Sequence, residues 1–376
     1  MRSRGGVSGA ILLLVCACLI GAAPAADQSP APASTASAPA AAPTSTPTPF
    51  LKRNVTTYAG SGVESQIDGP LLTATFAAVH FMVADPDRNS FYVTDKNEIR
   101  ELTKAGTVVT VAGASAAGNA DGTGTSARFN DPEGIAYDPI DKALYICDYR
   151  NFEIRRMTPD GVVTTIAGSP LEGRRDGSGA DAQFSHPQGI AYDARADALD
   201  VADTTNNEIR RVTAAGVVTT LAGGREGFAD GLGANARFSD PTGIAYDAAD
   251  GSAYVTDPGN ERIRHVAPDG TVTTLTGGSK ASFFGPTAMS RWGAPVGIAW
   301  DNVDGSLYVV DFVFSVVRRI STAGVVSNIA GNGSRGRYDG VFEGAEFSFP
   351  VGIAVDPATG SLYVADFGNN LIRMIQ

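Results

Sequence analysis

Short runs of apolar and β-branched residues follow one another along the chain from residue 54 to its end. In one stretch they occupy residues 134–138, 143–148, 153–158 and 162–168, with turn residues such as Pro-Asp-Gly between them. Runs of this length, rich in Ile, Val, Tyr and Thr, are typical of β-strands. No segment has the 3.6-residue apolar period of an amphipathic helix. The pattern therefore predicts an all-β protein.

The group of four runs recurs along the chain, and this repetition predicts the architecture. A Gly-Ile-Ala step marks five copies, and a methionine holds the isoleucine position in a divergent first copy. These positions lie 53 to 55 residues apart and are Met82, Ile135, Ile190, Ile244, Ile298 and Ile353. Six copies of four short strands predict a six-bladed β-propeller, with four strands per blade around a central channel.

The two ends of the repeat region predict how the ring closes. Residues 54–60 resemble a fourth strand that lacks its first three, and residues 372–376 resemble a third strand that lacks its fourth. We therefore expect the N-terminal strand to join the last blade. Such closure removes free sheet edges, which would otherwise pair with other chains.

The repeats also carry a family resemblance. Residues 361–375 (SLYVADFGNNLIRMI) and 134–157 (GIAYDPIDKALYICDYRNFEIRRM) resemble the repeats of NHL-repeat propellers, and the likeness extends over residues 54–376. Similar propellers serve as scaffolds, as receptor or sensor domains and, less often, as enzymes. The resemblance therefore implies the fold and leaves the activity open.

The N-terminal region has the composition of a targeting segment. Residues 1–25 combine two early arginines, an apolar run and a small-residue cleavage site, which predicts a signal peptide and an exported protein in the periplasm, tethered to the cell envelope or secreted. Alternatively, Cys18 is the lipidated residue of a lipoprotein and the only membrane anchor. Residues 26–53 are mainly Ala, Pro, Ser and Thr, which predicts a disordered spacer. Cleavage at Ala25 would leave Cys147 as the only cysteine and exclude an intrachain disulfide.

Charge and motif context exclude two classes of function. The formal net charge is −11 and no basic run occurs, so we expect no nucleic-acid binding. Gly-x-Gly-x-x-Ala appears at residues 122–127, but it recurs with the repeat and lacks the strand-to-helix context of a dinucleotide site. We expect its glycines to form turns with positive φ, and the small alanine to allow close packing.

Three kinds of residue recur in every copy, and we interpret them as structural. Aspartates that end the first strand are expected to accept hydrogen bonds from turn amides. A second aspartate and an arginine are expected to pair across strands two and three, and an aromatic residue to wedge between blades. The pairs are Asp95 and Arg100, Asp148 and Arg155, Asp203 and Arg210, Asp257 and Arg264, Asp311 and Arg318, and Asp366 and Arg373; the aromatic residues are Phe76, Phe129, Phe184, Phe238, Trp292 and Phe347.

Positions that differ between the copies are the candidates for function. Just before the Gly-Ile step, blades one to four offer polar side chains at the expected channel mouth: His80, Asp131, Glu133, His186 and Asp240. Two histidines and three carboxylates on one rim suit ligand binding and could hold a divalent metal ion, although no cofactor is required. The alternative is a solvated polar rim without an ion.

Blade five departs most from the repeat. Its loops contain Phe283, Phe284, Phe312 and Phe314, which together predict an apolar partner-binding patch. At the position of Phe314, other blades have an asparagine suited to a left-handed turn, for example Asn151. The alternative is a long loop that folds over its own aromatic residues.

These features favour an exported binding or scaffold module that recognises a protein, peptide or glycan through its loop face. No catalytic residues are assigned. The alternative function, by resemblance to propeller lactonases and amidating lyases, is a metal-dependent enzyme with its site at the channel mouth.

Overall fold

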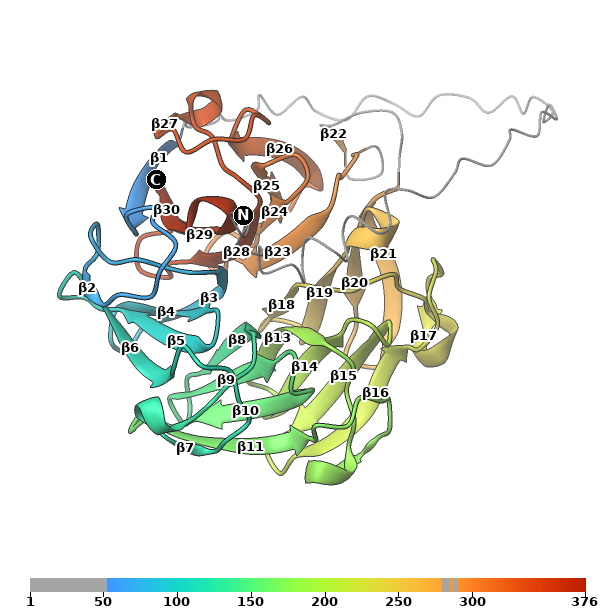
Figure 1. Cartoon of the computed structure of the whole chain (residues 1–376). Coiled ribbons are helices and arrows are strands. Elements are labelled where there is room, and N and C mark those ends of the chain that lie inside the picture. Colours follow the sequence, from blue (N-terminus) through green and yellow to red (C-terminus); the bar gives the residue numbers. More distant parts are fainter. Residues whose placement is uncertain (1–52, 279–284, 287–289) are drawn as a thin grey trace, which may run out of the picture. The chain divides into compact units, whose positions relative to one another are not determined.

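The computed structural model describes residues 53–278, 285–286 and 290–376. Within these residues, six antiparallel sheets form a ring, one sheet for each predicted repeat (Figure 1). This confirms the six-bladed β-propeller. The predicted signal peptide with Cys18, the spacer up to residue 52, and both Phe283 and Phe284 lie outside the described residues.

Each blade has its first strand innermost and its fourth strand near the outer edge. Blade one contains β2 (Gly69–Pro70), β3 (Val79–Asp85), β4 (Ser90–Asp95), β5 (Glu98–Leu102) and β6 (Thr107–Gly113). Blade two contains β7 (Gly122–Thr123), β8 (Pro132–Asp138), β9 (Ala143–Asp148), β10 (Glu153–Met157) and β11 (Val162–Gly168). Blade three contains β12 (Gly177–Ser178), β13 (Pro187–Asp193), β14 (Ala198–Asp203), β15 (Glu208–Thr213) and β16 (Val217–Gly223).

The other three blades follow the same order. Blade four contains β17 (Gly231–Leu232), β18 (Ile244–Asp247), β19 (Ser252–Asp257), β20 (Arg262–Val266) and β21 (Thr271–Gly277). Blade five contains β22 (Gly285–Pro286), β23 (Pro295–Trp300), β24 (Leu307–Asp311), β25 (Val316–Ile320) and β26 (Val325–Ala330). Blade six contains β27 (Gly340–Val341), β28 (Pro350–Val355), β29 (Leu362–Asp366), β30 (Leu371–Ile375) and β1 (Asn54–Ala59).

The N-terminal strand closes the ring, as predicted. Strand β1 pairs with β30, with Val55 opposite Ile375, so blade six is built from both ends of the described chain (Figure 1). The Val55 side chain is fully buried. Closure therefore contributes apolar packing as well as strand pairing.

Each blade has a fifth, two-residue outer strand that the sequence did not predict. In blade two it is β7, at the Gly-x-Gly phrase, and it pairs with β11. The second glycine, Gly124, has φ +56°, as expected. The first, Gly122, does not have positive φ; it lies in the strand, where a Cβ would come within 3.1 Å of the Ala127 nitrogen. The first glycine is therefore explained by close packing, and only the second by a left-handed turn.

The recurrent Arg–Asp pairs are confirmed and are fully buried. The shortest N–O distances are 2.6 to 2.9 Å in five blades and 3.6 Å for Arg318 and Asp311. Each guanidinium also lies over the recurrent aromatic ring, as Arg155 does over Phe129, with 5.2 Å between Cζ and the ring centroid. Phe184 packs between residues of blades two and three, including Cys147 and Val201, which confirms the wedge.

The two recurrent turns differ in how well the sequence predicted them. Asp138 Oδ1 accepts hydrogen bonds from the amides of Ile140 and Asp141, as expected for the first turn. In the second turn, the left-handed residue is Phe152, not Asn151. Asn151 is needed instead for its side chain, which donates to Asp148 and to the Gly118 carbonyl. This asparagine ties the turn to the loop that enters the blade.

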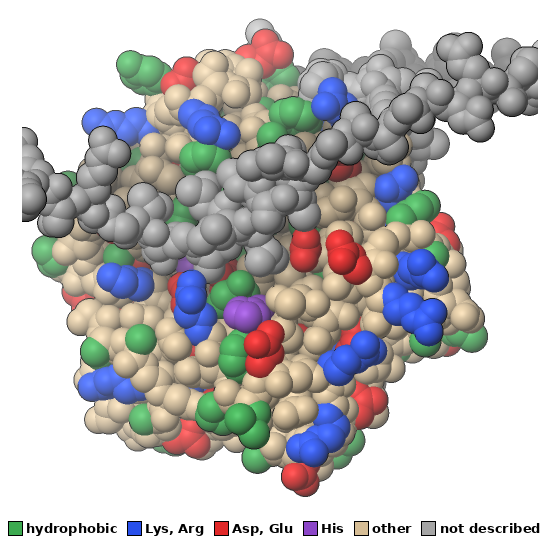
Figure 2. Space-filling view, turned by 45° about the vertical axis from the view of Figure 1, so that its right-hand side comes forward, with side chains coloured by type: hydrophobic (Ala, Val, Ile, Leu, Met, Phe, Trp, Pro, Cys, Tyr) green, Lys and Arg blue, Asp and Glu red, His purple; other side chains and the backbone are tan. Residues whose placement is uncertain are grey.

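The surface carries charges of both signs. On the face in Figure 2, basic and acidic side chains are interspersed and do not gather by sign. Among the described residues, no helix has the length and apolar character needed to cross a membrane.

Candidate functional site

The channel is bounded by the six innermost strands, which approach each other closely at their N-terminal ends. Five blades have glycine there: Gly134, Gly189, Gly243, Gly297 and Gly352. A Cβ on Gly189 would lie 2.0 Å from the carbonyl oxygen of Thr242 in the next blade. Glycine is therefore required for the ring to narrow at this level.

One residue before each glycine position, a ring of side chains occupies the narrow end of the channel. All six are buried, and they are His80, Glu133, Gln188, Thr242, Val296 and Val351. From the sequence, His80 and Glu133 are expected at an open channel mouth. In the structure they lie in the buried interior at this end of the channel.

His80, Asp131 and Glu133 come together at the junction of blades one and two. His80 Nδ1 lies 3.5 Å from Glu133 Oε2 and 4.0 Å from Asp131 Oδ1. One potential ligand atom from each residue falls within 4.8 Å of the others, as a metal site requires. His80 is on β3, Glu133 is on β8, and Asp131 immediately precedes β8 with φ +58°.

Burial controls the electrostatics of this cluster. Desolvation raises the pKa of Glu133 to about 7, although the charge of His80 opposes the shift. Burial by itself would lower the pKa of His80. The charges of Glu133 and Asp131, with a hydrogen bond to the backbone of Pro132, outweigh burial and raise that pKa. The imidazole and the two carboxylates therefore form one electrostatic unit.

Two neighbours of this cluster were missed by the sequence analysis. Arg150 donates from Nε to Asp131 Oδ2 at 2.9 Å. The pKa of the buried Tyr149 is raised, first by desolvation and then by the charge of Glu133. Both residues follow the strand-ending aspartate of blade two, a turn whose side chains differ from blade to blade. This variation between blades was the signal in the sequence that could have identified Tyr149 and Arg150.

The other two predicted mouth residues lie outside the cluster. His186 is partly exposed, contacts the Tyr149 ring at 4.7 Å between centroids, and lies 3.7 Å from Glu172. Burial lowers its pKa. Asp240 is half-buried, and its amide donates to Asn207 Oδ1. The structure therefore groups three of the five residues.

The predicted patch on blade five is largely internal in its described part. Phe312 is only 2% exposed and packs on Phe349, with 4.9 Å between ring centroids. Phe314 is half-buried, and the guanidinium of Arg318 lies 5.5 Å from its ring centroid. Phe312 therefore contributes to the protein core.

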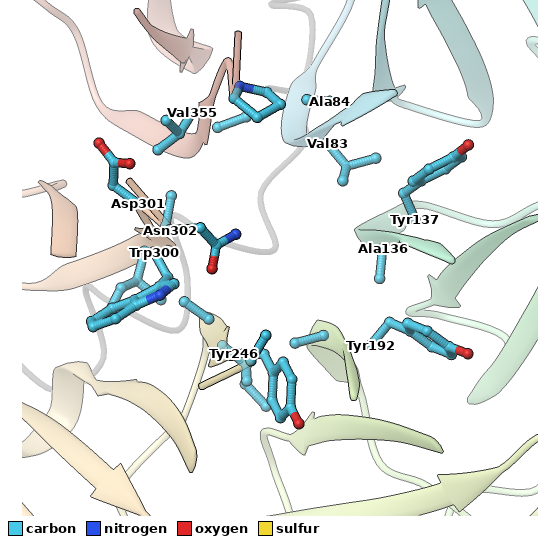
Figure 3. A pocket seen from close by; sticks show the side chains of 18 of the residues that line it. Val83, Ala84, Ala136, Tyr137, Tyr192, Tyr246, Trp300, Asp301, Asn302 and Val355 are labelled. Atoms are coloured by element: carbon cyan, nitrogen blue, oxygen red, sulfur yellow. The ribbon is translucent and has the colours of Figure 1, made fainter. Parts of the chain in front are cut away.

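The channel widens toward the opposite face, at the C-terminal ends of the innermost strands. There it forms an apolar cavity of about 410 Å³, which we call the funnel. Its lining includes Met82 and the five recurrent isoleucines. Tyr137, Tyr192, Tyr246 and Trp300 also line it and surround its open centre (Figure 3). In the sequence the isoleucines only mark the repeat, and no site was predicted at these positions.

The tyrosine hydroxyls of the funnel wall are already engaged, whereas the Asn302 amide points into the open centre (Figure 3). The hydroxyls of Tyr137, Tyr192 and Tyr246 point away from the open centre and donate to Asp87, Asp197 and Asp193, respectively (Figure 3). At the rim, Val303 is 79% exposed. An apolar wall with an exposed apolar rim is suited to apolar ligands.

Sequence comparison finds a repeat family and relatives that match most of this chain. The NHL repeat family matches residues 347–373. Protein SUPPRESSOR OF QUENCHING 1 of Arabidopsis thaliana is 25% identical over 342 residues, which cover 83% of this chain and 32% of that protein. NHL repeat-containing protein 2 of Gallus gallus is 22% identical over 346 residues, covering 81% of this chain and 46% of that protein. The chain spans less than half the length of these relatives.

Solved structures share the fold. An auxiliary nutrient binding protein from Bacteroides thetaiotaomicron has a TM-score of 0.67 at 18% identity, covering 86% of this chain and 76% of that one. A gluconolactonase from Xanthomonas campestris has a TM-score of 0.56 at 15% identity, covering 86% of this chain and 89% of that one. At these identities the likeness concerns the fold alone.

Proposed function

Because the chain is an NHL-repeat β-propeller, we propose that it is a binding module whose funnel receives an apolar side chain from a peptide or protein partner. The observation that carries this proposal is the cavity of about 410 Å³ on the channel axis. Cavities of roughly 300–1,000 Å³ with apolar walls are typical ligand sites.

The chemistry of the wall favours an apolar group over a glycan. A sugar needs many unpaired donors and acceptors, whereas the three tyrosine hydroxyls of the funnel are bound to aspartates. Asp301 and Asn302 are the other polar side chains in a lining that is otherwise apolar. The sequence predicts recognition on the opposite, loop face. We propose the funnel instead, because two features expected on the loop face are buried: Phe312 and the ring of side chains that includes His80.

We also propose that the module is exported. The support is the composition of residues 1–25, together with the fold shared with proteins named as auxiliary nutrient binding proteins of Bacteroides. Export would place the funnel where partners or nutrients outside the cytoplasm reach it.

The funnel can be tested with an apolar dye, 8-anilinonaphthalene-1-sulfonate. The chain has two tryptophans; Trp292 is fully buried and Trp300 lines the funnel, so entry of the dye should quench Trp300 fluorescence. We expect saturable binding of one dye per chain. Val83→Asp, which places a charge in the wall, should weaken binding at least about tenfold, because an unpaired charge in an apolar site is costly.

The matched control is Leu171→Asp, an equal change at a site that is 68% exposed and lies outside the funnel. It should leave the affinity unchanged. Equal weakening by both variants, or no saturable binding by the parent chain, would remove the funnel as the ligand site.

A metal-dependent enzyme is the second candidate, and the cluster of His80, Asp131 and Glu133 is the observation in its favour. The three side chains are each at most 8% exposed, which limits access of a substrate. Hydrolysis of glucono-1,5-lactone, followed by acid release with and without Zn²⁺ or Mn²⁺, tests this function. Metal-dependent turnover that His80→Ala abolishes would favour the enzyme.

A further inference from the structure

We propose that His80, Asp131 and Glu133 bind one divalent first-row transition-metal ion, of the Zn²⁺ class, which links blade one to blade two at the narrow end of the channel. This ion site is separate from the funnel and does not depend on the proposed binding function.

The distances suit such an ion. Zn²⁺ binds nitrogen and oxygen at about 2.0–2.2 Å, which places neighbouring ligands of a tetrahedral site about 3.3–3.6 Å apart. The nitrogen of His80 is 3.5 Å from the Glu133 oxygen and 4.0 Å from the Asp131 oxygen. Both distances from His80 therefore lie within about 0.4 Å of the tetrahedral spacing, and the three potential ligand atoms lie within 4.8 Å of one another.

Unpaired atoms point to a missing positive partner. Both carboxylate oxygens of Glu133 and Nδ1 of His80 are buried without a hydrogen-bond partner among the described residues. Glu133 is fully buried. An uncompensated buried carboxylate costs several kcal/mol, and a bound cation removes that cost. The same cation would bind Nδ1 of His80, so both the Glu133 carboxylate and the His80 imidazole would gain a partner.

An ion pair between His80 and Glu133 alone does not account for the distance between them. A charge-assisted hydrogen bond brings nitrogen and oxygen to about 2.7–2.9 Å. The observed 3.5 Å leaves room for an ion between the two atoms. Arg150 binds Asp131 through Oδ2, while Oδ1 is the oxygen nearer to His80. The second carboxylate therefore also presents an atom to the same space.

The repeats provide an internal comparison. The position of Glu133 is Gln188 in blade three, where the neutral amide accepts a hydrogen bond from Thr204. Blades five and six have valine there. The ring therefore accommodates neutral side chains, and the charge of Glu133 is not needed for packing. Glu133 lies in blade two, which is the neighbour of blade one with His80.

The ligand types narrow the choice of ion. Mg²⁺ and Ca²⁺ prefer sites made only of oxygen, whereas imidazole favours Zn²⁺ and related ions. Imidazole nitrogen and carboxylate oxygen are both zinc ligands, and sites with three protein ligands commonly hold a water molecule in the fourth position.

The test is the metal content of the tag-free chain, purified without chelator and measured by elemental mass spectrometry. We expect about one ion per chain, falling at least tenfold in His80→Ala and in Glu133→Gln. Added ZnCl₂ should raise the melting temperature of the chelator-stripped parent chain and leave that of Glu133→Gln unchanged, since only the native site gains binding energy.

His186→Ala and Asp240→Asn are the matched controls, because both lie on the same side of the ring and outside the cluster. They should keep the ion. Loss of metal in the controls as well, or a parent chain with neither metal nor a Zn²⁺- or Mn²⁺-dependent shift in melting temperature, would overturn the proposal. The dye titration of the funnel is run in chelator, so its result is independent.

Discussion

At the scale of single residues, the recurrent arginine is the main polar element of each blade. Arg155 is fully buried, donates to Asp148 at 2.6 Å and to Asp121 at 2.8 Å, and lies over Phe129. It joins the second and third strands, the outer loop and the aromatic wedge. A planar guanidinium can make these contacts together, which explains why lysine does not replace it in any blade.

Arg155→Met should lower the free energy of unfolding by about 3–5 kcal/mol, because it leaves the buried Asp148 without its cation. The neighbouring Arg156 pairs with the exposed Asp141, so Arg156→Met should cost about 1 kcal/mol or less. Urea unfolding followed by circular dichroism measures both. Similar losses in the two variants would contradict the assigned role of Arg155.

At the scale of elements, contacts between innermost strands set the width of the channel. The glycines of blades two to six allow these strands to approach, and the isoleucines that follow face the funnel. The Gly-Ile-Ala step therefore brings the strands together at one end of the channel and lines the funnel at the other. Cys147, on the second strand, fits this packing as a buried small residue with its thiol 3.8 Å from the Gly189 carbonyl.

Gly189→Ala should destabilise the protein by about 3 kcal/mol or more, since the added Cβ meets backbone of the next blade. In Gly344→Ala, a Cβ meets no atom within 4 Å, and stability should change little. Differential scanning calorimetry compares the two melting temperatures. If Gly189→Ala melts like Gly344→Ala, the strands are not in the close contact described.

At the scale of the whole molecule, the ring depends on one strand from the N-terminal side. Strand β1 supplies the fourth strand of blade six, and Val55 belongs to a core shared with blade five through Tyr308 and Val310. Each blade buries its faces against its neighbours, so loss of one strand exposes an edge and two apolar surfaces.

A chain that begins at residue 62 should aggregate or lose its cooperative unfolding transition, because β30 is left unpaired on one side. A chain that begins at residue 52 keeps β1 and should remain monodisperse by size-exclusion chromatography. Cooperative melting of the shorter chain at the temperature of the longer one would show that closure by β1 is dispensable.

Local and periodic features of the fold were predictable from the sequence by itself. Strand runs, the 53–55-residue period and the unmatched ends determined the number of blades and the closing strand, because both follow from counting along one chain. The Arg155–Asp148 pair was predictable for the same reason, since recurrence brings both residues to adjacent strands in every blade.

Only the tertiary structure decided which distant residues meet and how deeply they are buried. His80, Asp131 and Glu133 converge while His186 does not. His80 and Glu133 hold the ring position one residue before the recurrent glycine position, whereas His186 stands at the position of Asp131 in blade three, where the ring residue is the neutral Gln188. Phe312 is core and the ring at His80 is buried, whereas the isoleucines open into a funnel. Burial results from the packing of six blades around one axis, which no single repeat encodes.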